Sequence, residues 1–325
     1  MKTATPLWNG WLLAGGLAGA AVAFGQQVPD PNFPVKVATP TYTANHPRVL
    51  FDEAHFNVHT TKGSYQSFAE LVTNDGYQVT PNEKPFDTKT LAGADILVIA
   101  NARGAARPSE LPAFTEPECD AVRDWIRAGG NLLLVVDHYP TGHAVDSLAQ
   151  RLGVNLSKGT TTDPDHAAPG AGGMGTLLFA RTNQLIADHA VTLGRNEAER
   201  VNRVITFTGQ SLKGPEGSVA FLKLADTAVD RLPSAGTPGQ VAARPQARRP
   251  GPGAAAAGQS VSAAGRAQGV ALAFGKGRVV VLGEASQLSA QLAGPQQRPM
   301  GMNFPGIDNR QMALNIMHWL SRLID

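Results

Sequence analysis

The stretch Gly129-Gly130-Asn131-Leu132-Leu133-Leu134-Val135-Val136-Asp137-His138-Tyr139-Pro140-Thr141-Gly142 decides the fold of this chain. Its two glycines are typical of a helix end, and the apolar run that follows is short enough for a strand. Because the run is apolar at successive positions, both of its faces are expected to be covered, as in a central parallel strand. The polar residues Asp137 and His138 then follow at the carboxyl end, where open α/β sheets bind their ligands.

Comparable strands and helices precede this stretch in the sequence. Short apolar runs predict strands at Arg48–Asp52, Tyr77–Val79 and Asp95–Ala100. Apolar residues at helical spacing predict helices at Tyr65–Asp75 and from Glu116 up to the glycine pair. Repeated alternation of strand and helix implies parallel strands joined by right-handed crossovers. We therefore predict an α/β fold with a mostly parallel sheet and helices on both faces.

The C-terminal part adds a hairpin, a helix and a segment of low complexity. Val270–Phe274 and Arg278–Leu282 flank a Gly-Lys-Gly turn, which predicts a C-terminal β-hairpin extension. The segment Asn309–Leu323 carries one apolar stripe and is predicted to be the last helix. Residues 233–268 hold almost no large apolar side chains and are predicted to form a disordered insert.

The N-terminus has the pattern of an export signal. Residues 1–25 are predicted to be a signal peptide, because Lys2 precedes the apolar stretch Trp8–Ala23 and small residues mark a cleavage site. Residues 26–47 contain five prolines and are predicted to be a lead-in to one domain at 48–325. An uncleaved anchor is the alternative for the leader. We expect an exported protein, periplasmic or extracellular, without a stable membrane span after cleavage.

The distribution of charge argues against nucleic acid as a partner. The formal net charge is +2, but the insert holds four arginines and no acid, and Lys2 adds a positive charge in the leader. Subtracting these five charges leaves −3 for the remainder, so no excess of basic residues is left to bind phosphates. The single cysteine, Cys119, is interpreted as a small helix residue with no partner for an intrachain disulfide.

The order of segments resembles the class I glutamine-amidotransferase-like superfamily, in particular its secreted, uncharacterised bacterial branch, and more distantly trehalose-utilisation-type proteins. The resemblance rests on Arg48–His55, Ala94–Asn101, Gly129–His138, Gly277–Ser286 and Asn309–Leu320. Active members carry a nucleophilic cysteine on a Gly-x-Cys-x-Gly turn, where this chain has Val-Val-Asp-His-Tyr-Pro instead. The resemblance therefore implies a flavodoxin-like α/β fold without glutaminase chemistry, because no thiolate is present to attack an amide.

Polar side chains follow several of the predicted strands, and parallel strands bring their carboxyl ends to one edge of the sheet, which we call the rim. Carboxylates and imidazoles at such an edge can act as general acid and base or bind a divalent metal. The candidate catalytic residues are Glu53, His55, Asp137, His138 and Glu284. The candidate metal ligands are His55, Asp137 and His138. The candidate ligand-binding residues are Asp52, Asn57, Asn101, Arg103, Ser286 and Asn303.

Three interpretations of the rim stay open. The side chains can simply cap helices and satisfy the backbone of the loops. They can bind a small ligand or a protein partner in an exported, non-catalytic domain, which the missing cysteine turn favours. They can also serve a periplasmic hydrolase that uses the rim acids and histidines, with a divalent metal as the cofactor that these donors allow. The sequence does not decide whether the chain is an enzyme.

Overall fold

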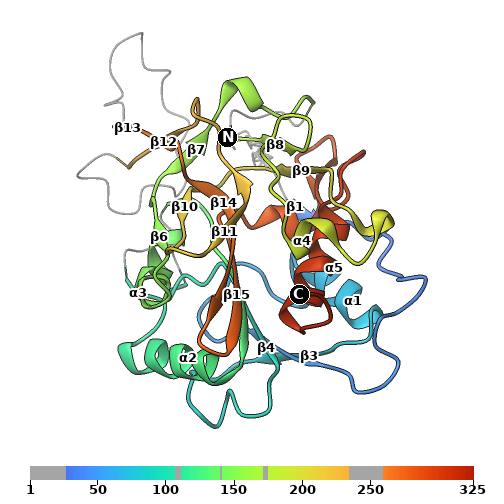
Figure 1. Cartoon of the computed structure of the whole chain (residues 1–325), viewed down its shortest axis with the longest axis vertical. Helices are drawn as coiled ribbons and strands as arrows, with labels where there is room; N and C mark the ends of the chain where they lie inside the picture. Colours follow the sequence, from blue (N-terminus) through green and yellow to red (C-terminus); the bar gives the residue numbers. More distant parts are fainter. Residues whose placement is uncertain (1–26, 107–110, 140, 171–174, 234–258) are drawn as a thin grey trace, which may run out of the picture.

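The computed structural model describes residues 27–106, 111–139, 141–170, 175–233 and 259–325. The predicted signal peptide lies outside these residues, as does most of the predicted insert at 233–268. Within the described residues the chain forms five α-helices and seventeen β-strands (Figure 1).

The largest sheet has nine strands and mixes parallel with antiparallel pairing. Its order is β3-β2-β4-β5-β15-β14-β10-β6, and β11 also pairs with β14. The parallel strands are β3 (Gln78–Asn82), β2 (Arg48–Asp52), β4 (Ile96–Ala100), β5 (Asn131–Val135) and β15 (Gly277–Leu282). The antiparallel strands are β14 (Ala267–Phe274), β10 (Leu212–Lys213), β6 (Asn155–Leu156) and β11 (Val219–Lys223). Sheet direction therefore changes at β15, which is parallel to β5 and antiparallel to β14.

Eight further strands build three small antiparallel sheets. The first holds β1 (Gln27–Pro29), β16 (Ala290–Ala293) and β17 (Arg298–Gly301). The second holds β7 (Thr160–Thr162), β12 (Val229–Arg231) and β13 (Ser260–Ser262), and the third holds β8 (Leu177–Ala180) and β9 (Arg203–Thr206). Strand β1 lies in the predicted lead-in, and β13 lies in the predicted insert. Both segments therefore contribute to the folded body.

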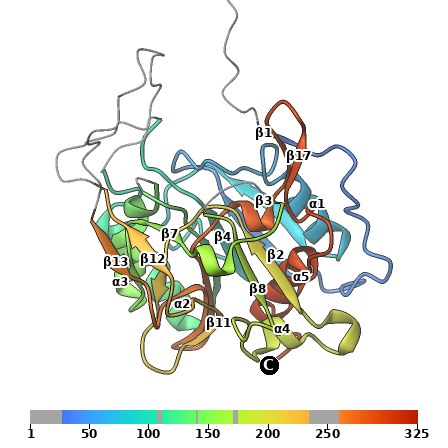
Figure 2. The ribbon, with the colours of Figure 1, turned by 90° about the horizontal axis from the view of Figure 1, so that it is seen from above.

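The helices lie in two groups, one on each side of the parallel strands (Figures 1 and 2). Helices α1 (Gln66–Asn74) and α5 (Asn309–Leu320) share one hydrophobic cluster, and the short α4 (Ala190–Leu193) packs against α5. Helices α2 (Glu116–Ala128) and α3 (Asp146–Arg151) belong to a second cluster. Strand β5 lies between the two, which explains why all five of its residues are buried.

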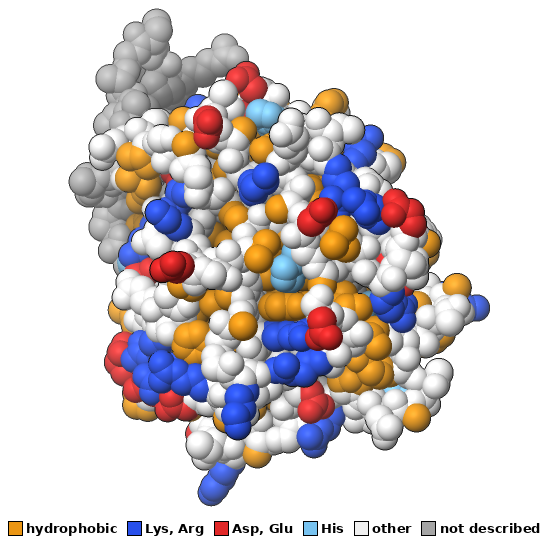
Figure 3. Space-filling model, in the orientation of Figure 1, with side chains coloured by type: hydrophobic (Ala, Val, Ile, Leu, Met, Phe, Trp, Pro, Cys, Tyr) orange, Lys and Arg blue, Asp and Glu red, His pale blue; other side chains and the backbone are white. Residues whose placement is uncertain are grey.

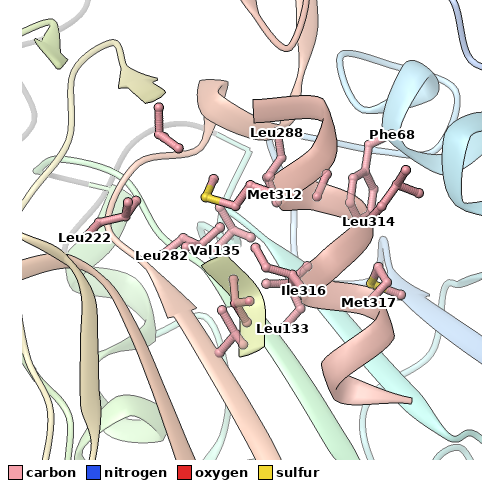
Figure 4. Packing of buried hydrophobic residues seen from close by; sticks show 14 of the residues in the cluster. Phe68, Leu133, Val135, Leu222, Leu282, Leu288, Met312, Leu314, Ile316 and Met317 are labelled. Carbon is pink, nitrogen blue, oxygen red and sulfur yellow. The ribbon is translucent and has the colours of Figure 1, made fainter. Parts of the chain in front are cut away.

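Helix α5 fixes the two central parallel strands from one side. Figure 4 shows Met312 and Ile316 beside Leu133, Val135 and Leu282, all of them fully buried. Burial of an aliphatic side chain of this size contributes about 1.5–3 kcal/mol relative to exposure. The last residues of β5 and β15 are therefore firmly held just before the polar residues of the rim begin.

The predicted flavodoxin-like, mostly parallel fold is wrong. Nine of the thirteen strand pairings among the described residues are antiparallel. The β14–β15 hairpin is not an extension, because β15 pairs with β5 and continues the main sheet. A short apolar run looks the same in a buried parallel and a buried antiparallel strand. Short polar strands such as β7, β12 and β13 contain no apolar run, so the sequence pattern does not predict them as strands.

The surface mixes charges of both signs. On the face shown in Figure 3, acidic and basic side chains are interspersed among polar and hydrophobic ones. In the part of the chain that the structure describes, no helix combines the length and apolar composition needed to cross a membrane.

Candidate functional site

The rim of the parallel strands brings two acidic residues together. Val135 of β5 is paired with Leu282 of β15 in a parallel register. Asp137 and Glu284 each lie two residues beyond this pair, so they leave the sheet side by side, on the face covered by α5. We call Asp137 and Glu284 the acid pair.

Backbone N–H groups, and no Lys or Arg side chain, hold the acid pair in the described structure. The two carboxylate oxygens of Glu284 accept hydrogen bonds from the backbone N–H groups of Ser286 at 2.7 Å and Gln287 at 2.8 Å. Asp137 accepts the backbone N–H of His138 at 2.6 Å. Glu284 is completely buried, whereas the side chain of Asp137 is 13% exposed. Asp137 is therefore the member of the pair that solvent reaches.

Burial makes both carboxyl groups retain their protons to near-neutral pH. It raises the pKa of Asp137 to about 7, although backbone hydrogen bonds from His138 and Ala285 act in the opposite direction. Burial and then the charge of Asp137 raise the pKa of Glu284 to about 8. Tyr65, whose hydroxyl donates to the carbonyl of Ala285 at 2.6 Å, also has a raised pKa because of burial and these two carboxylates. The pair therefore exchanges protons near pH 7, as a general acid–base group or a charge-sensing site requires.

Several buried side-chain atoms have no hydrogen-bond partner. Among the described residues, four buried side-chain atoms lack a hydrogen-bond partner: Gln287 Oε1, Gln268 Nε2, Asn101 Oδ1 and His318 Nδ1. The first three belong to residues that are at most 5% exposed. An unsatisfied buried polar group costs about 1–3 kcal/mol, so such groups normally find a partner.

The first three of these residues lie at the same end of the sheet as the pair. The side-chain amide nitrogen of Gln287 donates to the carbonyl of Glu284 at 2.6 Å. The backbone carbonyl of Gln268 accepts the N–H of Gly283, which precedes Glu284. Asn101, the first residue after β4, donates its N–H to the last residue of β5 and has a left-handed φ of 54°. The rim therefore combines two carboxyl groups with unused hydrogen-bonding capacity.

A second group of charges, which we call the His55 cluster, consists of Asp52, His55 and Glu118. The ring of His55 binds Asp52 Oδ1 through Nδ1 at 2.8 Å and Glu118 Oε1 through Nε2 at 2.9 Å. Asn57 donates to the other oxygen of Asp52, and Thr115 donates to the other oxygen of Glu118. Both ring nitrogens are thus occupied, and the histidine acts as a cross-link between β2 and α2.

The His55 cluster lies on the opposite face of the sheet from the acid pair. The His55 ring packs on Phe86 and Phe114, which belong to the hydrophobic cluster of α2 and α3. Burial lowers the pKa of His55, but the hydrogen bonds and charges of Asp52 and Glu118 outweigh it, and the net shift is upward. For Glu118, burial raises the pKa, but hydrogen bonds from Thr115 and His55 outweigh it and the net shift is downward. The cluster thus places one imidazole between two carboxyl groups and links β2 to α2.

The five candidate catalytic residues do not form one constellation. Asp137 and Glu284 come together, whereas His55 joins Asp52 and Glu118. His138 follows Asp137 at the rim, where its side chain is 38% exposed and its Nε2 lies 3.6 Å from Asp137 Oδ1. In the part of the chain that the structure describes, no three His, Cys, Asp or Glu side chains converge as metal ligands. The predicted metal ligands His55, Asp137 and His138 therefore have no shared coordination site.

Most of the other candidates support loops. Glu53 accepts hydrogen bonds from the backbone N–H and hydroxyl of Thr61. Arg103 donates to a backbone carbonyl in the β2–α1 loop. Asn303 binds Asp30 and a carbonyl of β16, so it ties the small β1-β16-β17 sheet together. These contacts follow the interpretation in which polar side chains satisfy backbone and loop groups.

Four residues of the two clusters were absent from the candidate list. Glu118 is an acid in the first turn of a helix and has the Thr-x-x-Glu spacing of a capping box, which explains it without a distant partner. Tyr65, Gln268 and Gln287 are single polar residues in or beside apolar segments. Their places at the rim depend on the pairing of strands far apart in sequence, for which the pattern holds no signal.

The fold and site define a sheet-rich domain with a mixed, mainly antiparallel strand pairing and a buried acid pair at the ends of two parallel strands. Residues 60–291 match the family described as Domain of unknown function (DUF4350), and the chain belongs to this family. The predicted membership of the glutamine-amidotransferase-like superfamily is therefore wrong. No curated protein matches the sequence.

Solved structures similar to this chain share little sequence with it. The mmIFT52 N-terminal domain has a TM-score of 0.56 and 12% identity, covering 84% of this chain and 97% of that domain. The cytoplasmic protein STM1381 from Salmonella typhimurium LT2 has a TM-score of 0.42 and 11% identity, covering 85% and 98%. A putative thua-like protein from Bacteroides uniformis ATCC 8492 has a TM-score of 0.43 and 12% identity, covering 86% and 94%. The first similarity concerns the fold alone.

Proposed function

We propose that this chain is an exported domain that binds a small polar ligand at the rim, with the acid pair at the centre of the site. The observation that carries the proposal is the set of buried, unsatisfied atoms on Gln287, Gln268 and Asn101, at the same end of the sheet as the pair. A ligand that pairs with these atoms gains hydrogen bonds that the protein alone leaves unmade. The apolar leader at Trp8–Ala23, preceded by Lys2, supports export.

The exposure of the pair favours a small ligand over a broad protein surface. Only 13% of the Asp137 side chain is exposed, and Glu284 lies behind it without any exposure. A flat partner surface reaches neither carboxyl group well, whereas a small molecule can enter beside Asp137.

The proposal is tested by thermal unfolding of the purified full chain with a panel of small amines, alcohols, amides and carboxylic acids. A ligand at one hundred times its Kd stabilises the folded state by about 2.7 kcal/mol. We expect at least one compound to raise the Tm of the wild type and of Asp124→Asn, an exposed carboxylate on α2. The same compound leaves the Tm of Asp137→Asn unchanged. A panel without any shift that depends on Asp137 contradicts the proposal.

A hydrolase is the second candidate, favoured by one observation. Asp137, whose pKa is raised to about 7 by burial, lies beside the imidazole of His138, so the rim holds a carboxyl group that can act as a general base near neutrality. This candidate predicts turnover of chromogenic esters, phosphates or glycosides that is lost in Asp137→Asn and retained in Asp124→Asn. Turnover that is equal in these two variants excludes Asp137 as the base.

A further inference from the structure

Glu284 differs from the other buried acids of the described chain in having no cationic partner. Six Asp or Glu residues are buried there: Asp52, Asp75, Glu118, Asp163, Asp230 and Glu284. Five of these have a His or Arg nitrogen within 4 Å: the ring of His55 serves Asp52 and Glu118, and the partners of Asp75, Asp163 and Asp230 are His318, His166 and Arg266. The fold thus supplies a basic side chain to every buried acid in this set except Glu284.

Asp137, the neighbour of Glu284, is almost as poorly compensated. Its one basic neighbour is His138, whose exposed ring lies 3.6 Å away. Tyr65, which also faces the pair, brings no positive charge. A buried charge without a partner is costly unless the group keeps its proton or acquires a counter-charge.

The unsatisfied atoms at this end of the sheet point to the same chemistry. Gln287 Oε1 and Asn101 Oδ1 are hydrogen-bond acceptors, and Gln268 Nε2 is the single donor among the three. Together with the carboxylates, the site presents acceptors and negative charge to whatever enters beside Asp137. A group that carries several N–H donors and a positive charge complements it.

Resting on the proposed function, we infer that the rim takes a small ligand with a primary ammonium or guanidinium group, which supplies the missing counter-charge to Asp137 and Glu284. The cation replaces a proton on the pair, because it stabilises the ionised form of both carboxyl groups. Binding near pH 7 therefore releases protons, in an amount set by how far the pair is protonated before the ligand arrives.

The test uses three probes of matched shape: n-butylammonium, n-butanol and butyrate. Each is titrated into the full chain at pH 7 in phosphate and in MOPS, two buffers with different ionisation enthalpies and without a primary ammonium group. We expect butylammonium to bind with an apparent enthalpy that differs between the buffers, which reports proton release. We expect its affinity to fall at least tenfold in Asp137→Asn and to change less than twofold in Asp124→Asn.

The outcomes separate this inference from the proposed function. If butanol or butyrate binds more tightly than butylammonium and depends on Asp137, the rim is a binding site but its ligand is not a cation. If butylammonium binds the wild type without proton release, the inference is overturned even if Asp137→Asn proves too unstable to assay. If no probe shows any dependence on Asp137, both the inference and the proposed function fail.

Discussion

The His55 cluster and the acid pair lie at the same edge of one sheet, on opposite faces, and differ in how their charges are balanced. In the cluster, one imidazole lies between the carboxylates of Asp52 and Glu118, at 2.8 and 2.9 Å. In the acid pair, Asp137 and Glu284 face each other with backbone N–H groups as their main partners. The charges of the His55 cluster are balanced within the protein. The charges of the acid pair are balanced only when the pair holds a proton or a ligand.

The difference in balance gives the two sites opposite pKa shifts. Both carboxyl groups of the pair have raised pKa values, so each destabilises the fold progressively as pH rises through its ordinary value towards 7–8. The raised pKa of His55 stabilises the fold fully below 6.5, and this stabilisation is lost as pH rises through the folded-state value. The lowered pKa of Glu118 stabilises the fold above 4.5, and this is lost as pH falls through the folded-state value. The acid pair and His55 therefore favour the folded state towards low pH, whereas Glu118 favours it above 4.5.

Removal of the His55 imidazole is expected to have the largest effect on the free energy of unfolding. His55→Ala leaves Asp52 and Glu118 as buried carboxylates without a counter-charge, and we expect a loss of about 3–5 kcal/mol. Urea denaturation at pH 6 measures it, since His55 is protonated there in the folded state. His138→Ala is the matched control, because that side chain is 38% exposed, and we expect a change within about 0.5 kcal/mol. Equal losses in the two variants contradict the assignment of His55 as the cross-link.

The acid pair depends on close backbone packing instead of ion pairs, and Gly142→Ala tests this dependence. A Cβ at Gly142 meets Gln210 Nε2 at 1.8 Å and the carbonyl oxygen of Asp137 at 2.1 Å, so the backbone at Asp137 has to move. We expect a loss of about 1–3 kcal/mol, together with loss of ligand binding that depends on Asp137. Gln210→Ala, which removes the hydrogen bonds to the Asp137 carbonyl and from the Lys158 N–H without adding volume, is expected to cost about 1–3 kcal/mol. A Gly142→Ala protein as stable as the wild type argues against this packing.

The pH dependence of stability distinguishes the pair from the cluster directly. From pH 5 to 8 the wild type loses stability, partly because Asp137 and Glu284 are forced to ionise in a buried site. Asp137→Asn removes one of these charges, and we expect the loss over this range to shrink by about 1–2 kcal/mol. Urea midpoints at each pH give the profile, and Asp124→Asn is expected to run parallel to the wild type. A parallel profile for Asp137→Asn as well means that the Asp137 carboxyl is already ionised without penalty.

Sequence alone predicted the contents of the rim better than its arrangement. Asp137 and Glu284 were both expected at the rim, because each follows a buried apolar run, but the sequence did not indicate that β15 pairs directly with β5. His55 was assigned to the same group, but the face on which a rim residue emerges depends on register and strand alternation, which no single strand reveals. The small antiparallel sheets were not predicted for a related reason. The pairing of short polar strands such as β12 and β13 depends on partners that are distant in the sequence.

The capping threonine of α2 offers the smallest and most specific test of the cluster. Thr115 donates to Glu118 Oε2 at 2.7 Å and caps the helix, so Thr115→Ala is expected to cost about 1 kcal/mol. It also removes a hydrogen bond that lowers the pKa of Glu118, so the stabilisation lost on acidification below pH 4.5 becomes smaller. Chemical denaturation between pH 3 and 6 measures both effects, with Thr115→Ser as the control that keeps the hydroxyl. If serine is as damaging as alanine, the hydroxyl does not orient Glu118, and Glu118 is held by His55 and by the backbone N–H groups of Phe86 and residue 115.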